Sequence, residues 1–209
     1  ENEVAEAQFI TESIQAICVQ EKRTYDDFCV LMRANTQSRP LEEQFLQENI
    51  PYVMSGGTSF FQRKEIKDII SYLRVIANHD DDVNLLRIIN TPRRGIGRTT
   101  IEKLNDVAKT LEVSLWEAIS AVLSAPEAES NLSDGTRNDL QGFVTLIENN
   151  KTLLSGKGLA KKVRALVEET RYFDHLITEN PKSEKAARFK FLNIESLINS
   201  MDSWENNPD

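Results

Sequence analysis

The residues best suited to chemistry lie in one basic, glycine-containing stretch, which reads Arg93-Arg94-Gly95-Ile96-Gly97-Arg98-Thr99-Thr100-Ile101-Glu102-Lys103. Glycine tolerates positive φ and lets a ligand approach the backbone closely. Backbone amides at a helix N-terminus bind anions without help from a side chain. The stretch contains four cationic side chains and only one carboxylate, and two threonine hydroxyls add hydrogen-bond donors. The stretch therefore predicts a phosphate-binding hairpin.

Apolar residues on both sides of this stretch have helical spacing, so one helix is expected to end before it and another to begin after it. Ile96 is expected to point inward and hold the hairpin to the two helices, with the amides of Ile96, Gly97 and Arg98 pointing outward. Such a helix–hairpin–helix holds a duplex by its phosphates without reading bases. The alternative is a C-cap glycine followed by a solvated basic turn. The predicted duplex-binding residues are Arg93, Arg94, Gly95, Ile96, Gly97, Arg98, Thr99, Thr100 and Lys103.

A second polar stretch, Arg33-Ala34-Asn35-Thr36-Gln37-Ser38-Arg39, follows an apolar run that reads as a buried strand. Ligands of open α/β sheets bind at the carboxyl ends of strands. Asn35 and Gln37 can donate and accept hydrogen bonds, and the two arginines can hold phosphates. The alternative is a polar turn in which Ser38 caps the next helix.

Other catalytic and metal-binding patterns are missing from the sequence. Ser155-Gly156-Lys157-Gly158 has a Gly-Lys pair but not the spacing of a phosphate loop. The two histidines lie far apart, the two cysteines do not complete a ligand pattern, and Asp80-Asp81-Asp82 is typical of a helix N-terminus. We therefore expect no metal site, no cofactor and no catalysis in this chain by itself.

The elements that must position these residues divide at Gly56-Gly57. Residues 1–55 read helix–strand–helix–strand, with strands at Phe28–Met32 and Ile50–Met54. Later residues have helical periodicity, with helices expected near 65–77, 80–90, 99–110, 114–124, 136–150, 157–169 and 184–203. The predicted fold is mostly α with a small α/β part. Two strands do not make a stable sheet, so the chain is expected to be a fragment of a larger protein.

Composition excludes several classes of protein. The 209 residues are 40% hydrophobic and 28% charged, with a net charge of -8, which is ordinary for a soluble globular protein. This charge argues against a uniformly basic nucleic-acid coat, although a local basic patch remains compatible with it. No apolar run is long enough to span a membrane, the acidic N-terminus is not a signal peptide, and two cysteines favour a reducing cytoplasm.

Several stretches, in order along the chain, resemble the superfamily 1A DNA helicases of the UvrD/Rep/PcrA family. The polar stretch 33–39 resembles their motif IV. The run Asp80-Asp81-Asp82 and the sequence Ser-Gly-Gly-Thr-Ser-Phe-Phe at residues 55–61 are most similar to the Rep branch of the family. Further matches are Ile50-Pro51-Tyr52, Ser55-Gly56-Gly57-Thr58-Ser59-Phe60-Phe61-Gln62-Arg63-Lys64-Glu65-Ile66-Lys67-Asp68, Tyr72-Leu73-Arg74 and Asn90-Thr91-Pro92-Arg93-Arg94-Gly95-Ile96-Gly97. Similarity is faint from residue 125 onward.

The resemblance implies an architecture and a set of partners. Residues 1–55 would begin the RecA-like domain 2A, residues 56–209 would form most of the helical domain 2B, and Gly56 and Gly57 would be a hinge. ATP and Mg²⁺ would bind to the ATP-hydrolysing parts of the helicase, which would lie outside this chain. The domains outside this chain would be 1A, 1B and the rest of 2A. The hairpin would grip duplex DNA, and replication or repair proteins are further possible partners. The implied single-strand contacts are Arg33, Asn35, Gln37, Ser38 and Arg39.

Three other readings remain open at this point. A related helicase–nuclease subunit would carry additional acidic motifs. A standalone helix–hairpin–helix DNA-binding module has no use for half a RecA-like sheet, so residues 1–55 argue against it. A helical protein-interaction domain without a motor is compatible with the overall negative charge.

Overall fold

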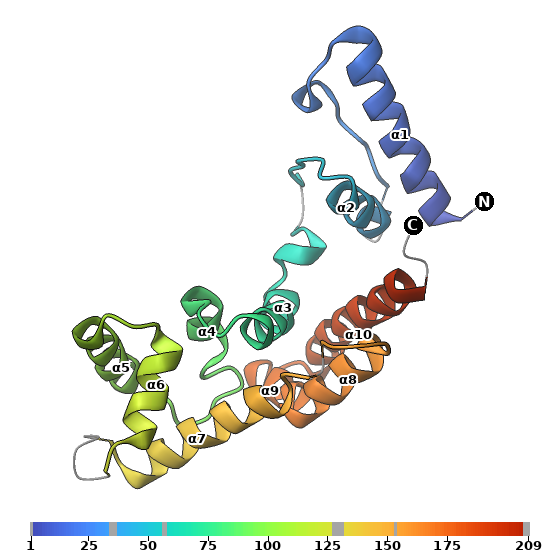
Figure 1. The fold of residues 1–209 in the computed structure, drawn as a ribbon. Helices are drawn as coiled ribbons and strands as arrows, with labels where there is room; N and C mark the ends of the chain where they lie inside the picture. Colours follow the sequence, from blue (N-terminus) through green and yellow to red (C-terminus); the bar gives the residue numbers. More distant parts are fainter. Residues whose placement is uncertain (1, 34–36, 56–57, 127–131, 153, 207–209) are drawn as a thin grey trace. The chain divides into compact units, whose positions relative to one another are not determined.

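The computed structural model describes residues 2–33, 37–55, 58–126, 132–152 and 154–206. The chain divides into two compact units, Glu1–Arg63 and Lys64–Asp209, and each is described by itself (Figure 1). The division lies between Arg63 and Lys64, whereas the sequence placed the domain boundary between residues 55 and 56. The expected hinge residues Gly56 and Gly57 lie outside the described residues.

Two helices form the body of the first unit. Helix α1 (Glu3–Glu21) packs against α2 (Ser38–Gln47), and single turns of 3₁₀-helix follow α1 at η1 (Tyr25–Asp27) and α2 at η3 (Phe60–Gln62). Both α-helices were predicted from apolar periodicity and are confirmed. Their small shared core comprises Ala7, Ile14, Leu41, Phe45 and Ile50.

The two predicted strands are not present among the described residues. Phe28–Met32 and Ile50–Met54 have no regular secondary structure there, and no backbone hydrogen bond joins them. A strand forms only when a neighbour accepts and donates its ladder of hydrogen bonds. Leu31 is 91% exposed and Val53 97%. The expected partial sheet is therefore not formed by these residues, and the prediction of strands is wrong for them.

The second unit is helical throughout the part that the structure describes (Figure 1). Every helix predicted in this region is confirmed, but α9 was not predicted. The helices are α3 (Lys64–Ala77), α4 (Asp82–Ile88), α5 (Arg98–Leu111), α6 (Leu115–Ser124), α7 (Asp134–Asn149), α8 (Leu159–Glu169), α9 (Tyr172–Glu179) and α10 (Glu184–Asn206).

Local sequence explains where several of these helices begin. Ser114 and Glu117 form the predicted capping box at α6, in which each side chain hydrogen-bonds the other residue's backbone N–H. Asp81 caps α4 by accepting from the Asn84 amide at 3.1 Å. Asp82 accepts from the Leu115 amide at 3.0 Å and so joins α4 to α6. The acidic run therefore caps helices, as the sequence indicated.

Helix α3 lies at the centre of the second unit. It packs against α4, α7 and α10, while α5 packs mainly against α6. The fully buried side chains of the shared core include residues from α3, α4, the loop after α4, and α7, among them Tyr72, Ile88, Ile96 and Phe143. The core thus holds the loop that carries the predicted hairpin.

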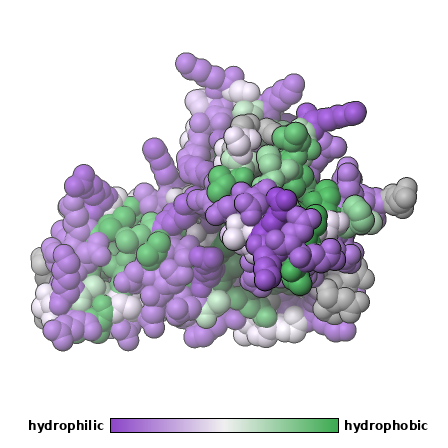
Figure 2. Space-filling view, turned by 90° about the horizontal axis from the view of Figure 1, so that it is seen from above, coloured by the Kyte–Doolittle hydropathy of each residue, from purple (hydrophilic) through white to green (hydrophobic). Residues whose placement is uncertain are grey.

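The molecular surface is largely hydrophilic on the face shown in Figure 2, with apolar residues reaching it in several places. Within the described ranges, the helices are all too short or too polar to cross a membrane.

Candidate nucleic-acid interface

Residues 89–97 connect α4 to α5 and contain both glycines of the predicted hairpin. Ile96 is fully buried in the core, as predicted. Gly95 has a φ of +79°, so the positive φ expected of a glycine is confirmed there. Gly97 has a φ of -85° and a ψ of 177°, an extended backbone that any residue can adopt, so the same expectation is wrong for Gly97.

The two glycines also differ in the space around them. A Cβ added at Gly95 would lie 2.3 Å from Oδ2 of Asp139, on α7. A Cβ added at Gly97 would meet nothing within 4 Å. The close approach that a glycine permits is therefore used within the protein at Gly95, whereas the space beside Gly97 is open.

Helix α5 begins at an exposed group of backbone amides. The Gly97 carbonyl accepts from the amides of Thr100 and Ile101, at 3.1 Å each. The amides of Gly97, Arg98 and Thr99 have no acceptor among the described residues, and all three residues are exposed. Free amides at a helix N-terminus favour an anion.

The amide of Ile96 does not belong to this group. The whole residue is 0% exposed, so its N–H is closed to a ligand in this conformation, contrary to the expectation. Thr100 is also buried, at 9%. The outward-facing part of the hairpin is therefore shorter than the sequence predicted.

Three of the four predicted cations reach the surface. Arg93 and Lys103 are exposed, and the Arg98 side chain is 92% exposed. Arg98 forms an ion pair with Glu102 at 2.8 Å, which is one turn farther along α5. Because both side chains of this pair are exposed, solvent screens it and it leaves the site open to a competing phosphate.

The fourth cation, Arg94, is half-buried, and its guanidinium is directed toward other groups of the protein. Its guanidinium donates to the carbonyls of Ile88 and Pro92 at 3.1 Å each, and to the hydroxyl of Tyr72. It also lies over the rings of Tyr72 and Phe143, 5.7 and 5.5 Å from their centroids. The contact of Arg94 with DNA phosphate stays a prediction; in this structure both terminal nitrogens of its guanidinium donate within the protein and hold the hairpin in place.

Helix α3 anchors the base of the hairpin through Tyr72. The Tyr72 hydroxyl donates to the Thr91 carbonyl at 2.5 Å. Burial raises the pKa of Tyr72 to about 12, although Arg94 acts in the opposite direction. The hydroxyl therefore stays protonated and able to donate at neutral pH.

One turn earlier on α3, a buried carboxylate joins three helices. Asp68 has a side chain only 2% exposed. It accepts from Arg87 on α4 at 2.7 Å and from the Tyr172 hydroxyl on α9 at 2.6 Å. Burial, followed by the charge of Asp68, raises the pKa of Tyr172. Paired in this way, the carboxylate is satisfied although it is desolvated.

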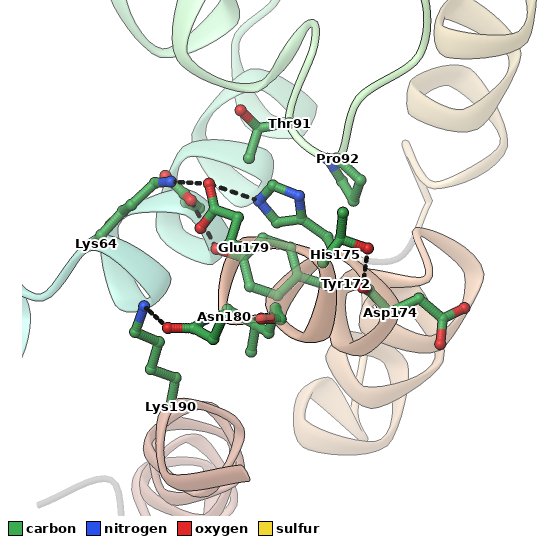
Figure 3. Close-up of polar contacts among 12 residues, drawn as sticks. Lys64, Thr91, Pro92, Tyr172, Asp174, His175, Glu179, Asn180 and Lys190 are labelled. Carbon is green, nitrogen blue, oxygen red and sulfur yellow. Dashed lines mark hydrogen bonds and ion pairs between the residues drawn. The ribbon is translucent and has the colours of Figure 1, made fainter. Parts of the chain in front are cut away.

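The first turn of α3 reaches the end of α9 (Figure 3). Lys64 donates to Glu179 at 2.5 Å, and Nε2 of His175 lies 3.6 Å from the same carboxylate. Burial lowers the pKa of His175, and Glu179 opposes this only in part. Burial also works against ionisation of Glu179, but Lys64 and His175 outweigh it and lower its pKa. In the view of Figure 3, the His175 ring lies between Glu179 and Pro92 of the hairpin.

A groove of ≈ 950 Å³ opens beside the hairpin. The hairpin forms one side of it through Arg93 and Arg94, and α7 and α9 contribute most of the rest. Four carboxylates line it, from Asp139, Glu169, Asp174 and Glu179. None of these carboxylates was predicted from the sequence, because no neighbouring residue in the chain indicates that they lie beside the hairpin.

The predicted single-strand site lies in the first unit, and only part of it is described. Asn35 lies outside the described residues. Arg33 is exposed, and its amide donates to Oε1 of Gln37 at 3.1 Å. Ser38 is 2% exposed and begins α2. Arg39 forms an ion pair with Glu43 at 2.7 Å and lies over the Phe60 ring. Of these side chains, Arg33 is the one best placed for a ligand.

In the part of the chain that the structure describes, His, Cys, Asp and Glu side chains form no group of three or more that could hold a metal ion. His79 stacks on Trp116, with ring centroids 4.3 Å apart. It also lies 3.6 Å from Glu148, so this histidine packs within the helical unit.

Comparison with known proteins identifies relatives over the whole chain. The family described as "UvrD-like helicase C-terminal domain" matches residues 1–209. The ATP-dependent DNA helicase PcrA of Bacillus subtilis is 33% identical over 98% of this chain and 27% of its own length. The ATP-dependent DNA helicase Rep of Buchnera aphidicola is 43% identical over 70% of this chain and 22% of its own length. The ATP-dependent DNA helicase PcrA of Staphylococcus epidermidis is 34% identical over 97% of this chain and 26% of its own length. The chain thus spans about a quarter of the length of these curated relatives.

Proposed function

Because the chain belongs to the UvrD-like helicase C-terminal domain family, we propose that it is the DNA-binding and regulatory part of an ATP-dependent 3′-to-5′ DNA helicase that unwinds duplex DNA in replication or repair. Its relatives are named as ATP-dependent DNA helicases. ATP and Mg²⁺ binding, hydrolysis and a cytoplasmic location are proposed for the whole protein. The 209-residue chain itself is proposed to be inactive, since its sequence has no phosphate loop.

The hairpin is proposed to hold duplex DNA by its phosphates. The observation that carries this proposal is the set of three exposed amides, from Gly97 to Thr99, that lack a protein acceptor among the described residues. A phosphate oxygen placed there would accept from these amides. The exposed side chains of Arg93, Arg98 and Lys103 would supply positive charge.

A single strand is proposed to contact the first unit at the polar stretch 33–39, of which Arg33 is the first residue. The guanidinium of this residue is exposed, and its backbone is held by Gln37. Asn35 stays in the proposal on the strength of the family resemblance alone. The rest of 2A, domains 1A and 1B, and replication or repair proteins are the proposed protein partners.

The test of the duplex site is the binding of a fluorescent duplex to the full 209-residue chain across a salt series. Non-specific binding should have a dissociation constant of roughly 10⁻⁴ to 10⁻⁶ M at physiological salt. Gly97→Ala should weaken binding without changing the fold, because the added methyl meets only open space and would lie where a phosphate approaches. Arg93→Ala should lower the salt slope by about one unit.

The matched control is Arg188→Ala, which removes an exposed, ion-paired cation from α10. It should leave affinity nearly unchanged. If Gly97→Ala and Arg93→Ala both bind like wild type while circular dichroism shows them folded, the hairpin is only a turn. A helical protein-interaction domain would then be the better reading. Phosphate release from ATP by the purified chain would contradict the proposed inactivity.

A further inference from the structure

Asp139 differs from the other carboxylates that line the groove beside the hairpin. Glu179 is paired with Lys64, Asp174 with Arg171 at 2.9 Å, and Glu169 accepts from Asn150 at 3.0 Å. Within the described ranges, no hydrogen bond or ion pair engages the Asp139 carboxylate.

This unpaired carboxylate lies directly on the hairpin. Its Oδ2 atom is 2.3 Å from the point where a Cβ of residue 95 would be, so the carboxylate occupies this position only because residue 95 has no side chain. The same turn of chain leads two residues later into the exposed amides at the start of α5. A negative charge is therefore held beside the surface proposed to receive a phosphate.

The local charge balance makes this position consequential. With Arg94 turned inward, the outward cations are Arg93, Arg98 and Lys103, against Glu102. The carboxylate of Asp139 further reduces the small net positive charge around the hairpin. Charges separated by less than about 8 to 10 Å interact appreciably at physiological salt.

We propose that Asp139 is an electrostatic gate on the hairpin: its carboxylate, seated on Gly95, opposes entry of a DNA phosphate, and duplex binding requires it to move away or be neutralised. This inference rests on the proposed function of the hairpin and adds its regulation. With the carboxylate in place, the affinity of the hairpin for duplex DNA is low. The duplex then stays bound only where other contacts also hold it.

The experiment measures duplex affinity of the full chain for Asp139→Asn, which removes the charge and keeps the shape. We expect affinity to rise about threefold to tenfold at low salt and the gain to shrink as salt is added. The fold should be unaffected, because no partner of Asp139 is lost. Asp202→Asn makes the same charge change on α10, where the residue is exposed, and should leave affinity nearly unchanged.

An NMR titration of wild type with the duplex gives a second readout. The amide signals of Gly95 and Asp139 should shift together as the carboxylate leaves its seat. Unchanged signals at both positions under saturating duplex would contradict the gate, even if affinity rose through a general change in net charge.

The gate and the proposed function fail in different ways. If Gly97→Ala and Arg93→Ala weaken binding but Asp139→Asn matches wild type, the hairpin binds DNA and the gate is wrong. If Asp139→Asn weakens binding, the carboxylate assists the grip, for example through a bridging cation, and the gate is again wrong. If none of the three variants changes binding, both proposals fail.

Discussion

At the scale of single residues, the two glycines of the hairpin have different tasks. Gly95 adopts positive φ and makes room for a carboxylate. Gly97 adopts an extended backbone and begins a helix whose first amides are exposed. One glycine is required by the fold, and the other keeps a surface open.

Gly95→Ala should therefore destabilise the protein. The left-handed backbone costs an L-residue about 1 to 2 kcal/mol, and the new methyl must also displace Asp139. Gly97→Ala should cost at most about 1 kcal/mol, the usual difference between good and poor N-cap residues. Urea unfolding of both variants measures this contrast.

The double variant Gly95→Ala with Asp139→Ala is the control. Removing the carboxylate relieves the collision but not the backbone strain, so part of the lost stability should return. Equal stability of the single and double variants would show that the close approach of Asp139 to residue 95 has no energetic weight.

Adjacent arginines in the hairpin should also behave differently. Arg94→Ala should lower the free energy of unfolding by about 2 to 3 kcal/mol, because the variant loses charged hydrogen bonds to buried carbonyls and to Tyr72. Arg93→Ala should stay within about 0.5 kcal/mol of wild type, as most exposed substitutions do. Thermal or urea denaturation of the pair tests this, and equal losses would contradict the inward role of Arg94.

At the scale of elements, α3 organises the second unit through side chains on successive turns. Lys64 contacts α9, Asp68 contacts α4 and α9, and Tyr72 contacts the hairpin. Together these bonds join α3 to α4, to α9 and to the hairpin, so a shift of α3 along its axis would disturb all of them. The hairpin is in this way connected to α9, which the sequence did not reveal.

The contact between α3 and α9 predicts a loss of stability in acid. A lowered pKa means that folding favours neutral His175, so its contribution is complete above its ordinary pKa of 6.5 and declines as pH falls below that value. Glu179 also has a lowered pKa, so its contribution holds above its ordinary pKa of 4.5 and is lost as pH falls further. Stability should therefore decrease from about pH 6.5 downward.

Urea unfolding at several pH values between 8 and about 4 measures this profile. His175→Gln keeps a polar side chain without a titrating ring, so its stability should depend less on pH between about 7 and 5. A variant whose acid profile coincides with that of wild type would show that burial of His175 has no part in the effect.

At the scale of the whole molecule, the two units differ in how complete they are. The first has a small core and two segments, 29–32 and 51–54, whose backbone groups have no hydrogen-bond partner among the described residues. The second has a core that draws on α3 to α8. We therefore expect the first unit to be the less stable of the two.

Hydrogen exchange of the isolated chain should show this difference. Amides of 29–32 and 52–54 should exchange rapidly, because backbone groups without hydrogen-bond partners have little protection. Amides in the interior of α3, α7 and α10 should exchange slowest, near the rate set by global unfolding. Strong protection of 29–32 in a dilute monomer would contradict the expectation that the first unit is the less stable of the two.

The sequence by itself determined most of the helices and part of the local geometry of the hairpin. Apolar periodicity located the helices, Ser114 and Glu117 fixed the start of α6, and Ile96 and Gly95 adopt the inward direction and positive φ that were predicted. These features depend on residues within a few positions of one another, and such interactions are visible in the sequence. The family resemblance also came from the sequence alone, and the comparisons confirm it.

Only the tertiary structure decided which polar groups of the hairpin face outward. Arg94 turns inward because Tyr72 and Phe143, distant in the chain, provide acceptors and aromatic faces. Asp139 reaches Gly95 because α7 packs beside the loop. The two predicted strands fail to form among the described residues because a ladder needs a neighbour that these residues do not supply. In each case the deciding partner is far away in sequence or outside the described chain, where neither periodicity nor local spacing can reveal it.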